Sequence, residues 1–338
     1  MQGWTGMYKN PYQENNLMKA AVYRSYGPPE VLTIEEIEKP APKDDEILVK
    51  IHASSVNPAE WYSMTGLFLA RLGNGLLKPK DTRLGVDYAG VVETVGKNIT
   101  LFKPGDEIYG ARSGAFAEYV CVKNHIYPKP ANITFEQAGS AAVAAMTALQ
   151  GLRDHGKLQA GQKVLINGAS GGVGTYAVQI AKALGAEVTA VCSTRNVDMI
   201  RSLGADHVID YTKEDFTRTD KRYEILLDIA GSRPWRECKR VLNPNAHYII
   251  VGAPKGNRVI GPLGFIIKTR LASLGASQKV IFFVASFKRE DFLLLNDMFE
   301  RGQVKPVVEK TYPLEKISEA MRHLGTGHAK GKIAVTMR

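Results

Sequence analysis

Hydrophobic and polar positions follow two different patterns along the chain. From Met18 to about Ile133, short runs of strand-forming residues recur, and turn signals such as the KPGD sequence at 103–106 separate them. This pattern predicts a module built of β-strands. After Glu136 the pattern changes to helices that alternate with apolar strands. Such alternation predicts an α/β fold with a doubly wound parallel sheet, whose ligands bind beyond the carboxyl ends of the strands.

Within the alternating half, a segment of small residues at 137–152 predicts one long helix. Apolar strands are expected at 163–167, 187–192 and further along the chain. The last of them, KVIFFVAS at 279–286, should lie near the edge of the sheet, where an apolar strand needs a cover or a partner. A homodimer that pairs two such edges is therefore possible.

The stretch from Lys163 to Cys192 reads as strand, glycine-rich turn, helix and strand. Gly171 and Gly172 leave no Cβ in the way of a pyrophosphate, free amides at the helix start attract its charge, and Gly174 lets helix and strand pack closely. This unit predicts a Rossmann dinucleotide site, although Ala169 replaces the first glycine of the usual fingerprint. The predicted cofactor contacts in the turn are Ala169, Ser170, Gly171, Gly172 and Val173.

The end of the second strand indicates which dinucleotide is bound. A site specific for NAD usually carries a carboxylate there, which would repel the 2′-phosphate of NADP. This chain has no carboxylate between Val191 and Arg195. Ser193 and Arg195 therefore favour NADPH, and Tyr211 can reach the same phosphate. The alternative is that Arg195 merely opens the next helix on a solvated surface.

Composition and charge narrow the functional classes. The chain has 338 residues and a formal net charge of +10, but its Lys and Arg residues are scattered, so nucleic-acid binding is not favoured. Cys121, Cys192 and Cys238 are too widely spaced for a disulfide framework or a metal knuckle. Since no apolar run approaches the roughly 20 residues that span a bilayer and no signal peptide is evident, we expect no membrane partner and a cytoplasmic protein.

Three sequence motifs carry a family resemblance: GVDYAGVVETVG at 85–96, KPGDEIYG at 103–110 and GASGGVG at 168–174. In this order they resemble the medium-chain dehydrogenase/reductase superfamily, and most closely its zinc-free branch of quinone oxidoreductases and 2-alkenal reductases. The resemblance implies a GroES-like catalytic domain of residues 18–140 and 287–338, with a Rossmann NADP-binding domain of residues 141–286 inserted. The active site would lie in the cleft between them. Residues 1–17 would be a flexible extension.

The places where zinc-dependent members of the superfamily carry metal ligands read differently here. The first place is Asn57-Pro58-Ala59-Glu60 and the second is Gly85-Val86-Asp87-Tyr88. We therefore expect neither zinc nor flavin. His52 and His125 are interpreted as structural or surface residues.

Without a metal, hydride transfer to an enone or quinone needs only modest hydrogen-bond donors for the charge that develops on the conjugated oxygen. The resemblance implies that Asn57 approaches the nicotinamide and that Tyr62 donates to the substrate oxygen, unless water supplies the proton. Phe68 stands where many relatives have a second tyrosine. Further cofactor contacts implied by the resemblance, each with a structural alternative, are Thr147, Gly252 and Phe283.

Three functions remain open from the sequence. The first is an NADPH-dependent quinone or 2-alkenal reductase that acts on a small molecule. The second is an enoyl-thioester reductase, which needs a basic entrance for the phosphates of its carrier. The third is a nucleotide-sensing or RNA-binding protein without catalysis. The basic residues that could form the entrance are Arg71, Lys78, Lys80 and Arg83.

Overall fold

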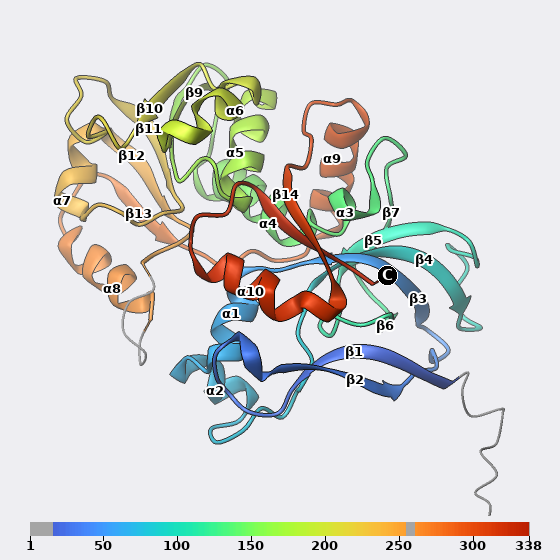
Figure 1. The fold of residues 1–338 in the computed structure, drawn as a ribbon. Coiled ribbons are helices and arrows are strands. Elements are labelled where there is room, and N and C mark those ends of the chain that lie inside the picture. The colour runs from blue at the N-terminus through green and yellow to red at the C-terminus, as the bar shows by residue number, and fades with distance from the viewer. Residues whose placement is uncertain (1–15, 255–260, 338) are drawn as a thin grey trace, which may run out of the picture.

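The computed structural model describes residues 16–254 and 261–337. It has two lobes, each built on its own large sheet, and the chain passes from the first lobe to the second and back (Figure 1). A small hairpin of β1 (Leu17–Tyr23) and β2 (Leu32–Glu38) accompanies the first lobe. The expected extension is one residue too long, because β1 begins at Leu17, which pairs with Glu38. Residues 1–15 lie outside the described part of the chain.

The first lobe contains a seven-stranded sheet in the order β14-β15-β3-β4-β5-β7, with β6 paired to β3. Two of these strands come from the end of the chain, and β15 pairs with β3 in antiparallel register, Ala334 opposite Ser55. The predicted β-rich module is therefore completed by the tail. The strands are β3 (Ile47–Ser55), β4 (Asp87–Val95), β5 (Glu107–Ala111), β6 (Tyr119–Val122), β7 (Ile126–Pro128), β14 (Val308–Pro313) and β15 (Lys332–Thr336).

The first lobe also contains helices. The short helices α1 (Pro58–Thr65) and α2 (Phe68–Asn74) follow β3, and α10 (Ile317–Gly325) lies between the last two strands. Apolar side chains of α10 and of β3, β4 and β15 form one buried cluster. This packing holds α1 beside the C-terminal segment, where the ring of Trp61 covers Gly325.

The second lobe contains a six-stranded parallel sheet in the order β10-β9-β8-β11-β12-β13. Numbered within the lobe this order is 3-2-1-4-5-6, which is the doubly wound Rossmann arrangement. The predicted α/β class is confirmed. The strands are β8 (Lys163–Asn167), β9 (Glu187–Cys192), β10 (His207–Asp210), β11 (Tyr223–Asp228), β12 (Leu242–Ile250) and β13 (Lys279–Phe282). The helices between them are α5 (Gly172–Ala183), α6 (Val197–Ser202), α7 (Trp235–Cys238) and α8 (Leu263–Ala272).

The single long helix predicted at 137–152 is wrong. The structure has α3 (Phe135–Ala138), a break, α4 (Ala142–Leu149) and a π-helical segment at Gln150–His155. The break occurs at Gly139, where an added Cβ would lie 2.6 Å from the carbonyl oxygen of Ala53. The helix restarts at Ala142, and the Asp87 carboxylate accepts the amide hydrogen of Val143 at 2.8 Å. A contact from β4 thus decides where α4 begins.

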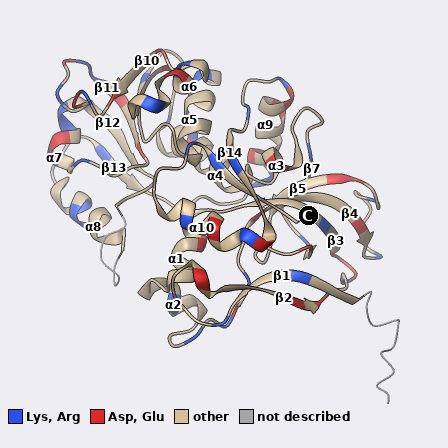
Figure 2. Cartoon of the chain, in the orientation of Figure 1, with Lys and Arg blue, Asp and Glu red and all other residues tan. Residues whose placement is uncertain are grey.

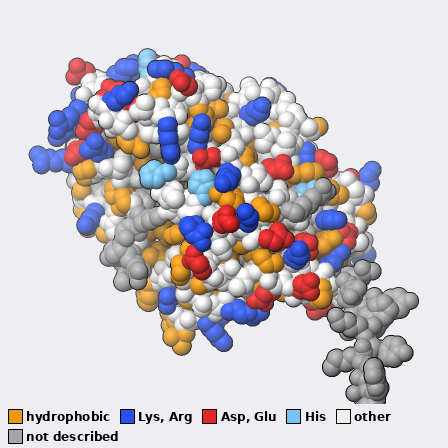
Figure 3. Space-filling view, in the orientation of Figure 1, with side chains coloured by type: hydrophobic (Ala, Val, Ile, Leu, Met, Phe, Trp, Pro, Cys, Tyr) orange, Lys and Arg blue, Asp and Glu red, His pale blue; other side chains and the backbone are white. Residues whose placement is uncertain are grey.

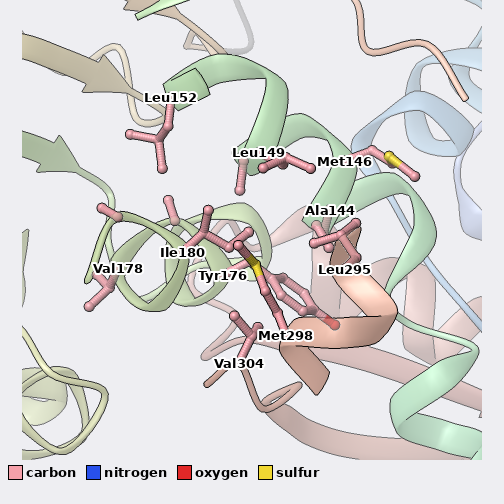
Figure 4. Close-up of a cluster of buried hydrophobic side chains, with 14 of the residues drawn as sticks. Ala144, Met146, Leu149, Leu152, Tyr176, Val178, Ile180, Leu295, Met298 and Val304 are labelled. Atoms are coloured by element: carbon pink, nitrogen blue, oxygen red, sulfur yellow. The ribbon is translucent and has the colours of Figure 1, made fainter. Parts of the chain in front are cut away.

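A continuous apolar core joins the two lobes. Helix α9 (Arg289–Glu300) packs Phe292 against Tyr127 of β7, with 4.0 Å between the ring centroids. Figure 4 shows Leu295 and Met298 of the same helix among side chains of α4 and α5. Because the core runs through the boundaries expected near 140 and 286, those domain limits stay a prediction.

Charged residues of both signs are spread over both lobes (Figure 2). On the face shown in Figure 3, Lys and Arg side chains are scattered among acidic, apolar and polar ones. This distribution gives no support to the nucleic-acid alternative, because such binding needs a concentrated basic surface.

In the described part of the chain, none of the helices has both the length and the apolar character that crossing a bilayer requires.

Candidate functional site

The glycine-rich turn between β8 and α5 has the close packing that the sequence predicts. Gly168 adopts a φ of +87°, which favours glycine. A Cβ on Gly174 would lie 2.3 Å from the carbonyl oxygen of Gly168, so only glycine allows α5 to approach the turn this closely. Gly171, by contrast, has open space, with its nearest neighbour 3.6 Å from an added Cβ.

The N-terminus of α5 can receive an anion. Gly171 is the N-cap and offers no side chain, and the first helical hydrogen bond runs from the amide of Thr175 to the carbonyl of Gly171. In the described chain, the amide of Val173 has no backbone acceptor, whereas Gly171 forms an isolated parallel β-bridge with Gly331, which brings the carbonyl of Gly331 beside Gly172. Ser170 is half-buried beside them, whereas Ala169 is fully buried and its methyl group belongs to the core. Any contact of Ala169 with a cofactor would therefore go through its backbone.

The residues predicted to select NADPH come together at the carboxyl ends of β9 and β10. The amide of Tyr211 donates to the carbonyl of Cys192 at 3.0 Å, which places Tyr211 beside Ser193. The Ser193 hydroxyl accepts from the side-chain amide of Asn196. The exposed Arg195 donates through Nη2 to the carbonyl of His328 at 2.7 Å. The C-terminal segment thus closes over this end of the sheet.

Sequence reasoning missed a carboxylate nearby. Asp210 ends β10, and its oxygens accept from the hydroxyl of Thr194 at 2.5 Å and from the hydroxyl and amide of Thr212 at 2.7 and 3.0 Å. The hydrogen bond from Thr194, followed by those from Thr212, lowers the pKa of Asp210 to about 2. The D-x-T spacing after a strand is a local signal of this kind of capped carboxylate.

Three further residues implied by the resemblance line different parts of the lobe. Thr147 is half-buried on α4, where its hydroxyl donates to the carbonyl of Val143 at 2.7 Å. Gly252 has a packing reason of its own, since an added Cβ would lie 2.1 Å from the carbonyl oxygen of Ile229. The ring of Phe283 packs on His155 with 4.3 Å between centroids. The side chain of Phe283 is therefore used in packing, which leaves its backbone for a cofactor.

Asn57 lies inside a buried polar cluster rather than open to solvent. It precedes α1, is 3% exposed, and its amide hydrogen is accepted by Glu60 Oε2 at 2.9 Å. Its side-chain Nδ2 lies 3.1 Å from Asp87 Oδ2, to which it donates, and its Oδ1 accepts from the ammonium of Lys332. Every polar group of the Asn57 side chain is thus engaged.

Asp87 is the centre of this cluster. Its Oδ2 accepts from Ser55 Oγ at 2.6 Å and lies 3.3 Å from Lys332 Nζ, while its Oδ1 caps α4. Burial, together with the neighbouring Asp87 carboxylate, raises the pKa of Glu60 to about 7. From the sequence, Asp87 and Glu60 were expected only as residues at places without zinc ligands, and nothing in the sequence indicated Lys332.

Tyr62 is half-buried on α1, one turn after Asn57. In the described chain its phenolic hydroxyl has no hydrogen-bond partner, and burial raises its pKa. A protonated phenol without a partner is available as a donor. Phe68 is 48% exposed at the start of α2.

The histidines considered as possible ligands have other contacts. The ring of His52 stacks on Phe135 with 4.3 Å between centroids, and the ring of His125 lies 5.5 Å from that of Phe287. Within residues 16–254 and 261–337, no three His, Cys, Asp or Glu side chains are placed to hold a metal ion.

Comparison with known proteins agrees with this architecture. Residues 43–131 match the family model of the alcohol dehydrogenase GroES-like domain, and residues 203–335 match the model described as zinc-binding dehydrogenase. The chain is 32% identical over 334 residues to 2-methylene-furan-3-one reductase of Solanum lycopersicum, covering 94% of this chain and 79% of that protein. It is equally identical, with the same coverage, to the chloroplastic NADPH-dependent alkenal/one oxidoreductase of Arabidopsis thaliana.

Among solved structures, the quinone oxidoreductase from Coxiella burnetii superposes with a TM-score of 0.82 at 27% identity, covering 95% of this chain and 100% of that one. The glycine turn, the two-lobed fold and these matches have one explanation. The chain belongs to the medium-chain dehydrogenase/reductase superfamily, in the branch of quinone and alkenal oxidoreductases.

Proposed function

We propose that the protein is an NADPH-dependent oxidoreductase that transfers a hydride to a quinone or to an α,β-unsaturated carbonyl compound. The observation that carries the proposal is the glycine-rich N-terminus of α5 in the same lobe as Ser193, Arg195 and Tyr211, with no carboxylate at the end of β9. The names of the Arabidopsis and Coxiella relatives support the substrate classes.

The residues of the chain have distinct tasks in this reaction. NADPH, when bound, supplies the hydride. The amides at the start of α5 bind its pyrophosphate, and Arg195 with Tyr211 binds the 2′-phosphate. Tyr62 donates a hydrogen bond, and then a proton, to the substrate oxygen that becomes negative. A tyrosine is protonated at neutral pH, and burial raises the pKa of Tyr62 further, so its phenol is a hydrogen-bond donor across the neutral range.

Anaerobic titration with NADPH and NADH, followed by a turnover panel, tests this function. The panel contains a quinone, a short enal, an enone and an enoyl thioester, with loss of the reduced nicotinamide as the signal. We expect turnover of a quinone or enone with preference for NADPH. Tight NADPH binding without turnover of any acceptor would contradict the proposal and favour a sensing role.

Arg195→Gln is expected to lower the preference for NADPH over NADH by about tenfold, because a charge-assisted hydrogen bond to the 2′-phosphate is lost. The measurement is the ratio of kcat/KM for the two cofactors. Arg201→Gln is the matched control, since Arg201 is an exposed arginine on the adjacent helix α6. An unchanged ratio in Arg195→Gln would mean that Arg195 serves only its contact with His328.

Tyr62→Phe is expected to lower kcat by about tenfold while the Kd of NADPH stays unchanged, because only the donor to the substrate oxygen is removed. Steady-state kinetics and a fluorescence titration measure the two quantities. Tyr119→Phe on β6 is the control in the same lobe. If Tyr62→Phe keeps full kcat, the proton comes from water.

The residues expected to form a basic entrance give little support to the alternative function, an enoyl-thioester reductase. Arg71 donates through Nε to the carbonyl of Gly66 at 2.8 Å and lies over the ring of Tyr26. It is therefore engaged within its own loop. Lys78 and Lys80 are exposed and remain as candidates. The thioester in the turnover panel tests this reading directly.

We also propose that the enzyme works without zinc or flavin, as a cytoplasmic homodimer. The places expected for zinc ligands hold Asn57 and Asp87, which already bind the ammonium of Lys332. The edge strand β13 ends in exposed apolar residues, and Val284 just beyond it is 82% exposed. Metal analysis, sedimentation and cell fractionation test these three points. Fractionation matters because some relatives are named chloroplastic.

A further inference from the structure

Lys332 lies where the two lobes meet. It is the first residue of β15, is 4% exposed, and its ammonium contacts Asn57 Oδ1 and Asp87 Oδ2 in the first lobe. Its aliphatic stem lies against the dinucleotide turn, since a Cβ on Gly172 would be 3.0 Å from Lys332 Cδ. The preceding residue, Gly331, donates its amide hydrogen to the carbonyl of Ser170 at 2.8 Å. One side chain therefore touches both halves of the proposed site.

The position of this ammonium is fixed from several sides. A buried lysine stays charged only where anionic and polar groups replace its hydration. Here the Asp87 carboxylate is the anionic partner of the ammonium. The same carboxylate accepts hydrogen bonds from Ser55 Oγ and from the amide of Val143 at the start of α4. The ammonium also donates to Oδ1 of Asn57, the residue that precedes α1. The position of the start of α1 therefore depends on Lys332 as well.

We propose that Lys332 is a positioning residue of the hydride-transfer site. It holds Asn57, and through Asn57 the helix that carries Tyr62, at a fixed place relative to the dinucleotide turn. Lys332 thus contacts both the dinucleotide turn and the residue that precedes the helix of Tyr62. Loss of the Lys332 ammonium is expected to change the distance between Tyr62 and the cofactor without removing either. This role rests on the proposed function.

Kinetics give the first test. Lys332→Met is expected to lower kcat by about tenfold or more while the Kd of NADPH changes less than about threefold, because misplacement of reacting groups affects the chemical step. Lys50→Met is the matched control, an exposed lysine on β3 in the same sheet. If Lys332 acts through Asn57, the double variant N57A/K332M loses no more activity than N57A alone. Additive losses would overturn the proposal.

A second test does not depend on turnover, so it stays readable if the proposed reaction is wrong. Trp61 is on α1, and in a W4F/W235F background it is the only tryptophan of the chain. Energy transfer from Trp61 to bound NADPH then reports the distance between α1 and the cofactor. At saturating NADPH we expect Lys332→Met to change the transfer efficiency and Lys50→Met to leave it unchanged.

If Lys332→Met does not fold, Lys332→Gln replaces it. The glutamine amide keeps a donor for Asn57 Oδ1, but it is shorter than the lysine side chain and carries no charge. We expect a smaller change of energy transfer than in Lys332→Met. Unchanged transfer in every variant that folds would overturn the assignment, whatever the outcome of the turnover panel.

Discussion

Gly174→Ala is expected to lower the free energy of unfolding by about 3 kcal/mol, because overpacking against rigid backbone forces the surrounding structure to move. The added Cβ would lie 2.3 Å from the carbonyl oxygen of Gly168 and 2.5 Å from that of Ala169. Neither atom belongs to a flexible side chain, so either α5 or the turn must shift. Affinity for NADPH should fall together with stability. Urea unfolding and a cofactor titration measure both effects.

Gly171→Ala is the matched control, in the same turn but without a steric conflict. Its φ of −81° suits alanine, and an added Cβ would be 3.6 Å from its nearest neighbour. We expect unchanged stability, but a Kd for NADPH raised by about tenfold, because the methyl group occupies the space for the pyrophosphate. Unchanged affinity in Gly171→Ala would contradict the phosphate site. Native stability in Gly174→Ala would contradict the close packing of α5.

The second large effect is a dependence of stability on pH that comes from Glu60. Its pKa in the folded protein is about 7, above the ordinary value of 4.5, so the folded state keeps a proton that the unfolded state releases. Stability should therefore fall as the pH rises from about 4.5 to about 7, by about 3 kcal/mol in total, and level off above this range. The contribution of Glu60 is fully present only at the acidic end.

Glu60→Gln tests this dependence because glutamine stays neutral at every pH. Near pH 4 the two proteins should be about equally stable, and above pH 7 the variant should be more stable by up to about 3 kcal/mol. Urea unfolding at steps from pH 4 to pH 8 gives the difference, in which the other titrating groups cancel. Glu36→Gln, an exposed change on β2, should keep the native profile. A constant difference between native protein and Glu60→Gln would falsify the burial argument.

The parts of the site that the sequence predicted have local causes. The strand, turn and helix of the dinucleotide unit lie within 30 consecutive residues, so periodicity and glycine spacing suffice to find them. Ser193 and Arg195 follow from their place directly after β9. Tyr211 follows a strand that pairs with β9, and strand order in this fold class is regular.

What the sequence could not predict depends on contacts between distant segments. Lys332 meets Asn57 across 275 residues, and a single lysine after a glycine has no local signature. The same holds for the break before α4, because the small residues at 137–152 suit a continuous helix, whereas Asp87 of the distant strand β4 accepts the amide hydrogen of Val143 where α4 begins. The approach of Asn57 to the cofactor stays a prediction, and the sequence did not indicate that its side-chain polar groups join α1 to Asp87 and Lys332.

The arrangement of the seven-stranded sheet sets an order of events during synthesis. Strands β3, β4 and β6 leave the ribosome early, but β15, which pairs with β3 at Ala53, Ser54 and Ser55, follows much later in the chain. The parallel sheet of the second lobe is complete by Phe282 and can fold before that. The last residues of β3 therefore keep unpaired backbone groups until β15 has been made, and such an edge can pair with other chains. The pair of Asp87 and Lys332 can form only then, so this buried polar cluster is completed after both sheets have been synthesised.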